Sequence, residues 1–175
     1  MCLKNLHMPK LVVSLILPFL AAFIGSVFTS PSIPTWYASL NKPFISPPNW
    51  IFAPVWTALY LLMGIAAYMV WNKGVGKGWD SLKFWRRKKD EENIRTSMYL
   101  FVTQLVFNAL WSILFFGLRS PVLAFWEIIV LWVLIMATSF RFYEVDKKAG
   151  ILMVPYILWV SFAAFLNLNI WILNM

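Results

Sequence analysis

The sequence contains very few of the side chains that bind metals or form disulfide bonds. Its 175 residues include one cysteine, Cys2, and one histidine, His7. A single cysteine excludes an internal disulfide, a cysteine-based zinc site and an iron–sulfur cluster, and a single histidine excludes a site built from several histidines. No constellation of a nucleophile with a base stands out in the sequence. We therefore expect no metal site and no required cofactor.

Charge is also scarce. Charged residues make up 13% of the chain and hydrophobic residues 61%, whereas about a quarter of a soluble domain is charged. The apolar residues gather in five runs of about 18–24 residues, which suit helices that cross a bilayer and are too long for the strands of a barrel. These runs cover about 11–28, 50–71, 97–116, 122–142 and 150–173. The sequence predicts an all-α membrane protein with a single domain over 1–175, built as a five transmembrane helix bundle.

The first run also has features of a secretory signal peptide, namely a basic start and small residues at 21–22 and 25–26. Its apolar stretch of about 18 residues is longer than the core of a usual signal peptide. We therefore predict an uncleaved first helix.

The basic residues are distributed unevenly between the connections. Thirteen of the fifteen Lys and Arg residues lie in the N-terminal segment, between 73 and 95, or between 141 and 148, and five helices place these three regions on one side of the membrane. The other side carries Lys42 and Arg119. Because basic loops remain in the cytoplasm, we predict a cytoplasmic N-terminus and a C-terminus on the opposite side.

The connection 73–95 contains a basic cluster at 83–89 that is flanked by aromatic residues. One interpretation is a loop that sets the topology, and the other is an interfacial helix lying on anionic headgroups. The acidic residues 90–92 partly balance the cluster, and we favour the topology-setting loop. The basic residues sit in one short membrane loop without a recognisable motif, so we expect no nucleic-acid partner.

Aromatic residues make up 18% of the chain and include 11 tryptophans. Trp and Tyr gather at both interfaces of a bilayer, which accounts for the tryptophans near the ends of the predicted helices. These are Trp36, Trp50, Trp71, Trp79, Trp85 and Trp171. Trp56, Trp111, Trp132 and Trp159 lie deeper and require another explanation.

Helical spacing places most of the deep tryptophans on the same faces as amides and small residues. The three faces are Trp56, Tyr60, Gly64 and Ala67; Gln104, Asn108, Trp111 and Phe115; and Trp159, Ala163, Asn167 and Trp171. Amides need partners in hydrocarbon, so these faces should point into the bundle. Spacing alone favours simple packing of the bundle core, and a pocket for a flat apolar ligand is the alternative.

Glu127 is the one acidic residue deep inside a predicted helix. An ionisable group at that depth is a functional candidate by default. The alternative is a protonated or hydrogen-bonded carboxyl group close enough to the interface to reach water. The neighbouring sequence does not favour either interpretation.

Prolines stiffen the loop before the second predicted helix. Pro31, Pro34, Pro43, Pro47 and Pro48 all fall within this segment. Proline fixes its own backbone and restricts the residue before it, so the loop should be ordered. An ordered loop above a helix bundle could act as a lid.

Several short motifs follow one another in order along most of the chain. They are Pro34-Thr35-Trp36-Tyr37, Lys42-Pro43, Pro47-Pro48-Asn49-Trp50, Ala53-Pro54-Val55-Trp56-Thr57, Gln104-Leu105-x-x-Asn108-x-x-Trp111, Leu114-Phe115-Phe116-Gly117, Pro155-Tyr156-x-x-Trp159 and Leu166-Asn167-x-x-Ile170-Trp171. In this order they resemble the translocator protein family (TSPO), also called tryptophan-rich sensory proteins or peripheral-type benzodiazepine receptors. The resemblance covers about 30–174.

The resemblance implies a five-helix bundle that forms a homodimer. It also implies a lidded pocket for flat hydrophobic ligands: porphyrins such as protoporphyrin IX and haem, isoquinoline or benzodiazepine-type drugs, and sterols. Carried over by motif, the ligand-binding residues are Tyr37, Pro47, Phe52, Trp56, Tyr60, Asn108, Trp111, Trp159, Ala163 and Leu166. The implied role is sensory or regulatory, in tetrapyrrole metabolism or the stress response.

The resemblance implies two alternative functions. One is light- and oxygen-dependent degradation of porphyrin, in which Trp56 and Trp159 would take the catalytic positions. The other is transport of porphyrins, sterols or lipids. The sequence departs from the family's cholesterol pattern, because 166–175 lacks a Tyr followed by a basic residue, although Arg95-x-x-x-Tyr99-x-x-Val102 fits the inverted pattern. His7 lies outside the predicted helices, so we expect no axial histidine on a bound haem.

Overall fold

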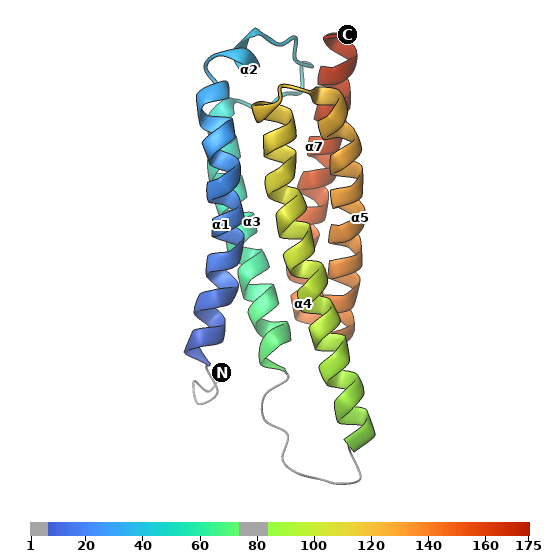
Figure 1. Cartoon of the computed structure of the whole chain (residues 1–175). Helices are drawn as coiled ribbons and strands as arrows, with labels where there is room; N and C mark the ends of the chain where they lie inside the picture. Colours follow the sequence, from blue (N-terminus) through green and yellow to red (C-terminus); the bar gives the residue numbers. More distant parts are fainter. Residues whose placement is uncertain (1–6, 74–83) are drawn as a thin grey trace.

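The computed structural model describes residues 7–73 and 84–175, with side chains from Asp90 onward in the second range. The regular elements in these ranges are all helical (Figure 1). In chain order they are α1 (Met8–Ser32), α2 (Trp36–Ser39), α3 (Asn49–Asn72), α4 (Phe84–Ser112), the π-helix η3 (Ile113–Gly117), α5 (Pro121–Val145), α6 (Lys147–Leu152) and α7 (Val154–Leu173).

Five helical stretches in the described residues are long and apolar enough to cross a bilayer. They are Met8–Ser32, Asn49–Asn72, Asp90–Gly117, Pro121–Val145 and Lys147–Leu173. Large apolar side chains such as Phe23, Trp126 and Leu158 are more than half exposed on the outer surface, where lipid chains would cover them. The predicted fold of an all-α bundle with five membrane-spanning helices is confirmed.

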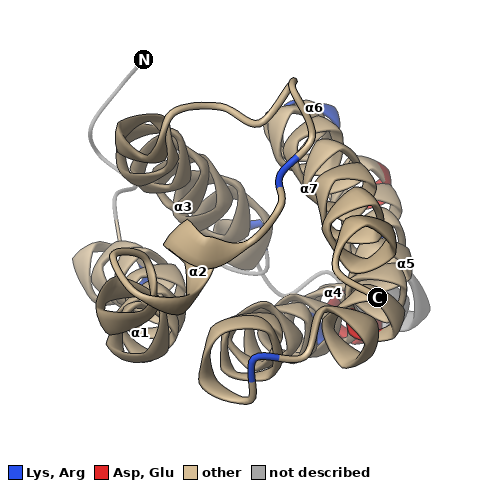
Figure 2. Ribbon diagram, turned by 90° about the horizontal axis from the view of Figure 1, so that it is seen from above, with Lys and Arg blue, Asp and Glu red and all other residues tan. Residues whose placement is uncertain are grey.

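The long helices run alternately up and down, so the described N-terminal end and the C-terminus lie at opposite ends of the bundle (Figure 1). Seen from above, they form a ring in the order α1, α3, α7, α5 and α4, which closes onto α1 (Figure 2). The backbones approach closely between α1 and α3, α1 and α4, α4 and α5, and α5 and α7. The side of the membrane that each end faces remains a prediction from the charge distribution.

The start of the third helix differs from the expectation. The prediction placed it at about 97 after a polar connection 73–95, but α4 begins at Phe84 and its membrane-spanning stretch at Asp90. The apolar run measures only the part that lies in hydrocarbon. Arg, Lys and Glu are good helix formers in water, so the helix continues beyond the apolar run. The side chains of the basic cluster 83–89, and residues 74–83 altogether, lie outside the described residues.

The end of the third helix widens into a π-helix, which the sequence analysis did not predict. In η3, Leu118 N–H donates to the carbonyl oxygen of Ile113 at 2.8 Å, which is an i to i+5 bond. Arg119 then adopts a φ of 53° and reverses the chain. Both Phe115 and Phe116 are buried in this wider turn. π-Helical turns recur at functional sites. This one lies against the connection between α1 and α3, residues 33–48, which contains α2 and is called the lid segment below.

The small residues on α1 pack inside the same chain. Ala21 and Gly25 are buried, and a Cβ atom added at Gly25 would lie 2.9 Å from the Ser112 Oγ of α4. Gly25 therefore allows the close approach of α1 and α4. This part of α1 therefore packs against α4 of the same chain.

A salt bridge joins two connections at the end of the bundle opposite the lid. Lys73 Nζ lies 3.0 Å from Asp146 Oδ2, and Asp146 Oδ1 accepts a hydrogen bond from the backbone N–H of Lys148, which caps α6. Burial alone raises the pKa of the Asp146 carboxyl, but the hydrogen bonds and the positive charge of Lys73 outweigh it and hold the pKa below its ordinary value. Asp146 therefore stabilises the folded state most when it is ionised.

The contribution of Asp146 to stability should disappear in acid. Because its folded pKa is lowered, the contribution is complete above the ordinary value of about 3.9 and is lost as the pH falls through the folded pKa. Asp146→Asn keeps a capping oxygen but removes the charge, and it should cost about 0.5–1 kcal/mol at neutral pH. Unfolding of both proteins in detergent, measured from neutral pH downward, should show this difference shrinking toward zero. A difference that does not change with pH would assign the effect to the cap alone.

Candidate functional site

A chain of hydrogen-bonded side chains crosses the centre of the bundle. The Tyr60 hydroxyl of α3 donates to Asn108 Oδ1 of α4 at 2.7 Å, and Asn108 Nδ2 donates to the Tyr156 hydroxyl of α7 at 2.9 Å. Tyr156 in turn donates to Gln104 Oε1 at 3.0 Å, and Gln104 Nε2 points to the sulfur of Met63 at 3.8 Å. All of these residues are buried. The chain ties α3, α4 and α7 together and satisfies polar groups that would otherwise be stranded in hydrocarbon.

Aromatic rings fill the seam between α3 and α7, where the two backbones stay apart. The Trp56 ring stacks on Tyr60, with the centroids 5.3 Å apart and the planes at 28°. Trp56 also meets the edge of Tyr156 at 6.2 Å, and Phe52 meets Trp159 at 6.1 Å. Trp56 and Tyr60 follow one face of α3, as the spacing predicted, and Phe52, which the family resemblance named, lies one turn before Trp56 on the same face. The seam is therefore lined with aromatic rings that lie beside the central chain of hydrogen-bonded side chains.

Two side chains near this seam have buried polar atoms that make no hydrogen bond. Within the described part of the chain, neither carboxyl oxygen of Glu127 has a partner, and neither does the indole Nε1 of Trp159. Glu127 is only 7% exposed and lies within electrostatic range of Tyr156. The absence of a protein partner among the described residues is consistent with a functional role for Glu127, which stays a prediction. Buried acceptors and donors without partners are costly, so these two residues mark a place where a polar ligand group would be stabilised.

A second aromatic cluster lies under the lid segment. Tyr37 of α2 contacts Phe115 and Phe116 of η3, with ring centroids 6.3 and 5.7 Å away, and Trp111 stacks on Phe115 at 5.1 Å. Trp111 Nε1 donates to Asn167 Oδ1 at 3.1 Å. Burial raises the pKa of the Tyr37 hydroxyl, so this group stays neutral. The π-helix thus supplies the two phenylalanine rings against which Tyr37 of the lid segment packs.

Hydrogen bonds fasten the lid to the end of α7. The backbone N–H of Asn41 donates to Asn174 Oδ1 at 3.0 Å, and Asn174 Nδ2 donates to the Asn41 carbonyl at 2.9 Å. Lys42 Nζ donates to the Tyr37 carbonyl at 2.7 Å and lies 4.7 Å from the centre of the Tyr37 ring. Figure 1 shows α2 and its flanking segments running across the top of the bundle toward the C-terminus. These contacts hold the segment in one arrangement, as its prolines predicted, and its role as a lid stays a prediction.

The predicted ligand-binding residues fall into three groups: those at the seam, those under the lid segment, and those outside both. Phe52, Trp56, Tyr60, Asn108 and Trp159 come together at the seam. Tyr37 and Trp111 meet in the aromatic cluster under the lid through Phe115. On α7, Ala163 is half-buried against the core and Leu166 is buried, and Pro47 lies half-buried between α2 and α3. No ring or hydrogen-bond contact in the described residues links these last three to the seam.

Tyr156 belongs to the site, although it was not among the residues predicted from the sequence. Tyr156 links Asn108 to Gln104 and touches Trp56. It lies three residues before Trp159 and seven before Ala163, so helical spacing placed it on the predicted α7 face. A search for polar partners of Asn108 on that face would have found it.

Comparisons with known proteins agree with this architecture. Residues 14–172 match the TspO/MBR family. The chain is 41% identical to the tryptophan-rich protein TspO of Archaeoglobus fulgidus over 94% of this chain and 97% of the relative. It is 34% identical to the tryptophan-rich sensory protein of Cereibacter sphaeroides over 92% of each chain. It is 33% identical to the translocator protein of Bos taurus over 89% of this chain and 85% of the relative. The chain therefore belongs to the TspO/MBR family and is a multi-pass membrane protein.

Proposed function

We propose that this protein binds porphyrins, such as protoporphyrin IX and haem, and other flat hydrophobic molecules in the seam between α3 and α7. The binding would serve a sensory or regulatory role. One observation carries the proposal: stacked and edge-on rings pack between two helices, and the nearby Trp159 indole N–H and Glu127 carboxyl group have unused polar atoms. Names of relatives, "tryptophan-rich sensory protein" and "translocator protein", are consistent with it.

The chemistry of the seam suits a flat conjugated ring. Aromatic side chains bind such rings by offset stacking and by edge contacts, and both arrangements are present among the seam residues. The indole N–H of Trp159 offers a donor to a carboxylate or carbonyl group. The Glu127 carboxyl group offers an acceptor to a pyrrole N–H. Because Phe52 and Trp159 touch across the seam, these side chains must turn aside as the ligand enters.

A titration tests the proposal directly. Purified protein in detergent is titrated with protoporphyrin IX in the dark, and tryptophan fluorescence is followed. We expect saturable quenching, because the deep indoles would contact the porphyrin, and reversal by an isoquinoline-type competitor. An acyclic hydrophobe of similar polarity serves as the control. Quenching that rises linearly without saturation, or that the acyclic compound reverses equally well, contradicts binding at a specific site.

The same seam supports a second candidate, light-dependent degradation of porphyrin. The supporting observation is the presence of two indoles, Trp56 and Trp159, in one seam, where a photosensitising ring would touch both. Illumination in the presence of oxygen should then remove the porphyrin absorbance over many turnovers per protein. Loss that stops after a single turnover, or that proceeds equally with free tryptophan, would leave binding as the function.

A further inference from the structure

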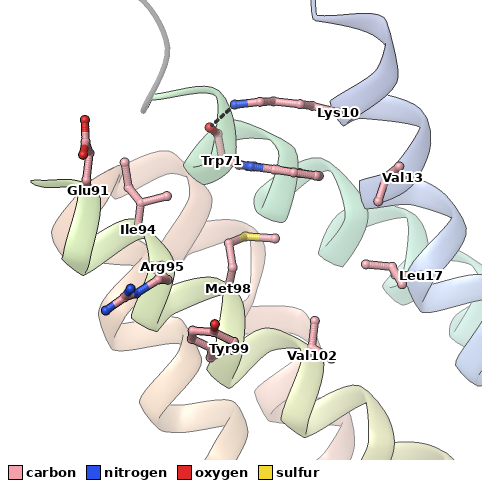
Figure 3. A pocket seen from close by; sticks show the side chains of 10 residues that line it. All are labelled: Lys10, Val13, Leu17, Trp71, Glu91, Ile94, Arg95, Met98, Tyr99 and Val102. Atoms are coloured by element: carbon pink, nitrogen blue, oxygen red, sulfur yellow. Dashed lines mark hydrogen bonds between the residues drawn. The ribbon is translucent and has the colours of Figure 1, made fainter.

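A cavity lies at the end of the bundle opposite the lid. It has a volume of about 460 Å³ and opens between α1 and α4, with the last turn of α3 at its edge (Figure 3). None of the residues that line it belongs to the aromatic seam. The site is therefore separate from the one proposed above for flat ring ligands.

Charged side chains gather at one end of this cavity. The helices α1 and α4 run in the same direction (Figure 1), and along each of them the charged lining residues come before the apolar ones. Lys10 precedes the apolar residues of α1, and Glu91 and Arg95 precede most of those of α4. Among the described residues that line the cavity, the mouth thus holds two cations and one anion, which leaves one positive charge in excess.

The position of Lys10 is fixed by α3. Its Nζ atom donates to the carbonyl oxygen of Trp71 at 3.1 Å and lies 5.3 Å from the centre of the Trp71 ring (Figure 3). The carbonyl belongs to the last turn of α3, where unpaired carbonyl groups attract cations. An ammonium group has three donors, so Lys10 has further N–H groups to offer to an anion.

Below the mouth the walls are apolar. Val13 and Leu17 of α1 lie opposite Met98 and Val102 of α4 (Figure 3). From Glu91 to Val102 the helix rises about 16 Å, at 1.5 Å per residue. A bilayer has a hydrocarbon core of about 30 Å, so the cavity spans roughly one leaflet. Val13 and Val102 are 41% and 42% exposed, and they face the surroundings of the protein rather than its core.

We propose that this cavity binds a glycerophospholipid with one net negative charge. Its phosphate lies between Lys10 and Arg95, and an acyl chain follows the apolar walls. Basic pockets between transmembrane helices are known to hold anionic headgroups, and the single excess charge matches one phosphodiester. Free phosphate would leave the apolar walls unused, and the added cation of a zwitterionic lipid would face two like charges. The proposal holds whichever leaflet this end faces.

Native mass spectrometry of the full chain in detergent tests this site. Phosphatidylglycerol is titrated against phosphatidylcholine with the same acyl chains, and retained lipid is counted for each protein. The variant Lys10→Gln/Arg95→Gln should bind phosphatidylglycerol about 25-fold more weakly, from about fivefold for each cation. The control Lys147→Gln/Lys148→Gln removes the same charge from exposed positions near the same end and should bind as the parent does.

A further variant tests the apolar wall. Val102→Trp fills the groove and leaves both cations in place, so it should also lose phosphatidylglycerol. If Lys10→Gln/Arg95→Gln does not fold, Arg95→Gln alone should still show about a fivefold loss. Equal losses in the two charge variants, equal retention of phosphatidylcholine, full binding by Val102→Trp, or displacement by a sterol or by inorganic phosphate would each overturn the proposal.

Discussion

Replacing both Trp56 and Trp159 by alanine is expected to weaken the binding of protoporphyrin IX by about 100-fold. Each ring contact that is lost is worth about 1–1.5 kcal/mol, and each 1.4 kcal/mol is a factor of ten. Both residues are only half-buried and neither belongs to the central hydrogen-bonded chain, so the bundle should still fold. The affinity is best followed through the porphyrin absorbance, since the substitutions themselves change the tryptophan fluorescence.

A matched control uses a tryptophan that faces outward. Trp126 lies on the same bundle but is 61% exposed, and Trp126→Ala should leave the porphyrin affinity unchanged. The variant Trp159→Phe keeps a ring in the seam and removes the buried N–H. It should cost about tenfold if that N–H bonds the ligand. An unchanged affinity in the double variant, or an equal loss in Trp126→Ala, contradicts the proposed position of the pocket.

The number and type of the helices could be predicted from the sequence because the bilayer imposes them. A helix must bury about 20 apolar residues to cross, so five runs of that length define five helices. The ends of the helices are less constrained. Helix α4 continues to Phe84 because charged residues form helices well in water, and the apolar run carries no information about that extension.

Part of the site could also be predicted. The residues Trp56 and Tyr60 lie one turn apart, and so do Gln104 and Asn108, so helical periodicity alone placed each pair on one face. Periodicity does not say how neighbouring helices are shifted along their axes. The bonds from Asn108 to Tyr60 and to Tyr156 depend on that shift, and only the packed bundle shows them.

The lid depends on features that no local pattern encodes. The π-helix turns both Phe115 and Phe116 inward, although regular α-helical spacing would separate two adjacent side chains by about 100°. Asn41 and Asn174 are far apart in the sequence, and nothing near either residue predicts that they pair. The Glu127 carboxyl was recognised as unusual from its depth, but its lack of a partner became visible only in the structure.

The central hydrogen-bonded chain should make a measurable contribution to stability. Asn108→Leu preserves volume but removes the acceptor of the Tyr60 hydroxyl and a donor to Tyr156. Tyr156 keeps Gln104 as a partner, whereas the Tyr60 hydroxyl is left buried without one. The expected loss is about 1–2 kcal/mol in the free energy of unfolding, measured by denaturation in mixed detergent micelles. The control Asn169→Leu removes an amide that bonds within its own helix and should have a smaller effect.

A double-mutant cycle identifies the source of that loss. Tyr60→Phe removes the stranded hydroxyl, so adding it to Asn108→Leu should recover part of the stability rather than lower it further. The coupling between the two positions should be about 1 kcal/mol. Because Trp56 stacks on Tyr60, the same bond holds one wall of the proposed pocket in place. Asn108→Leu should then also weaken porphyrin binding, and Tyr60→Phe in that background should not restore it. Additive losses of stability would show instead that the bond between Tyr60 and Asn108 contributes nothing to the fold.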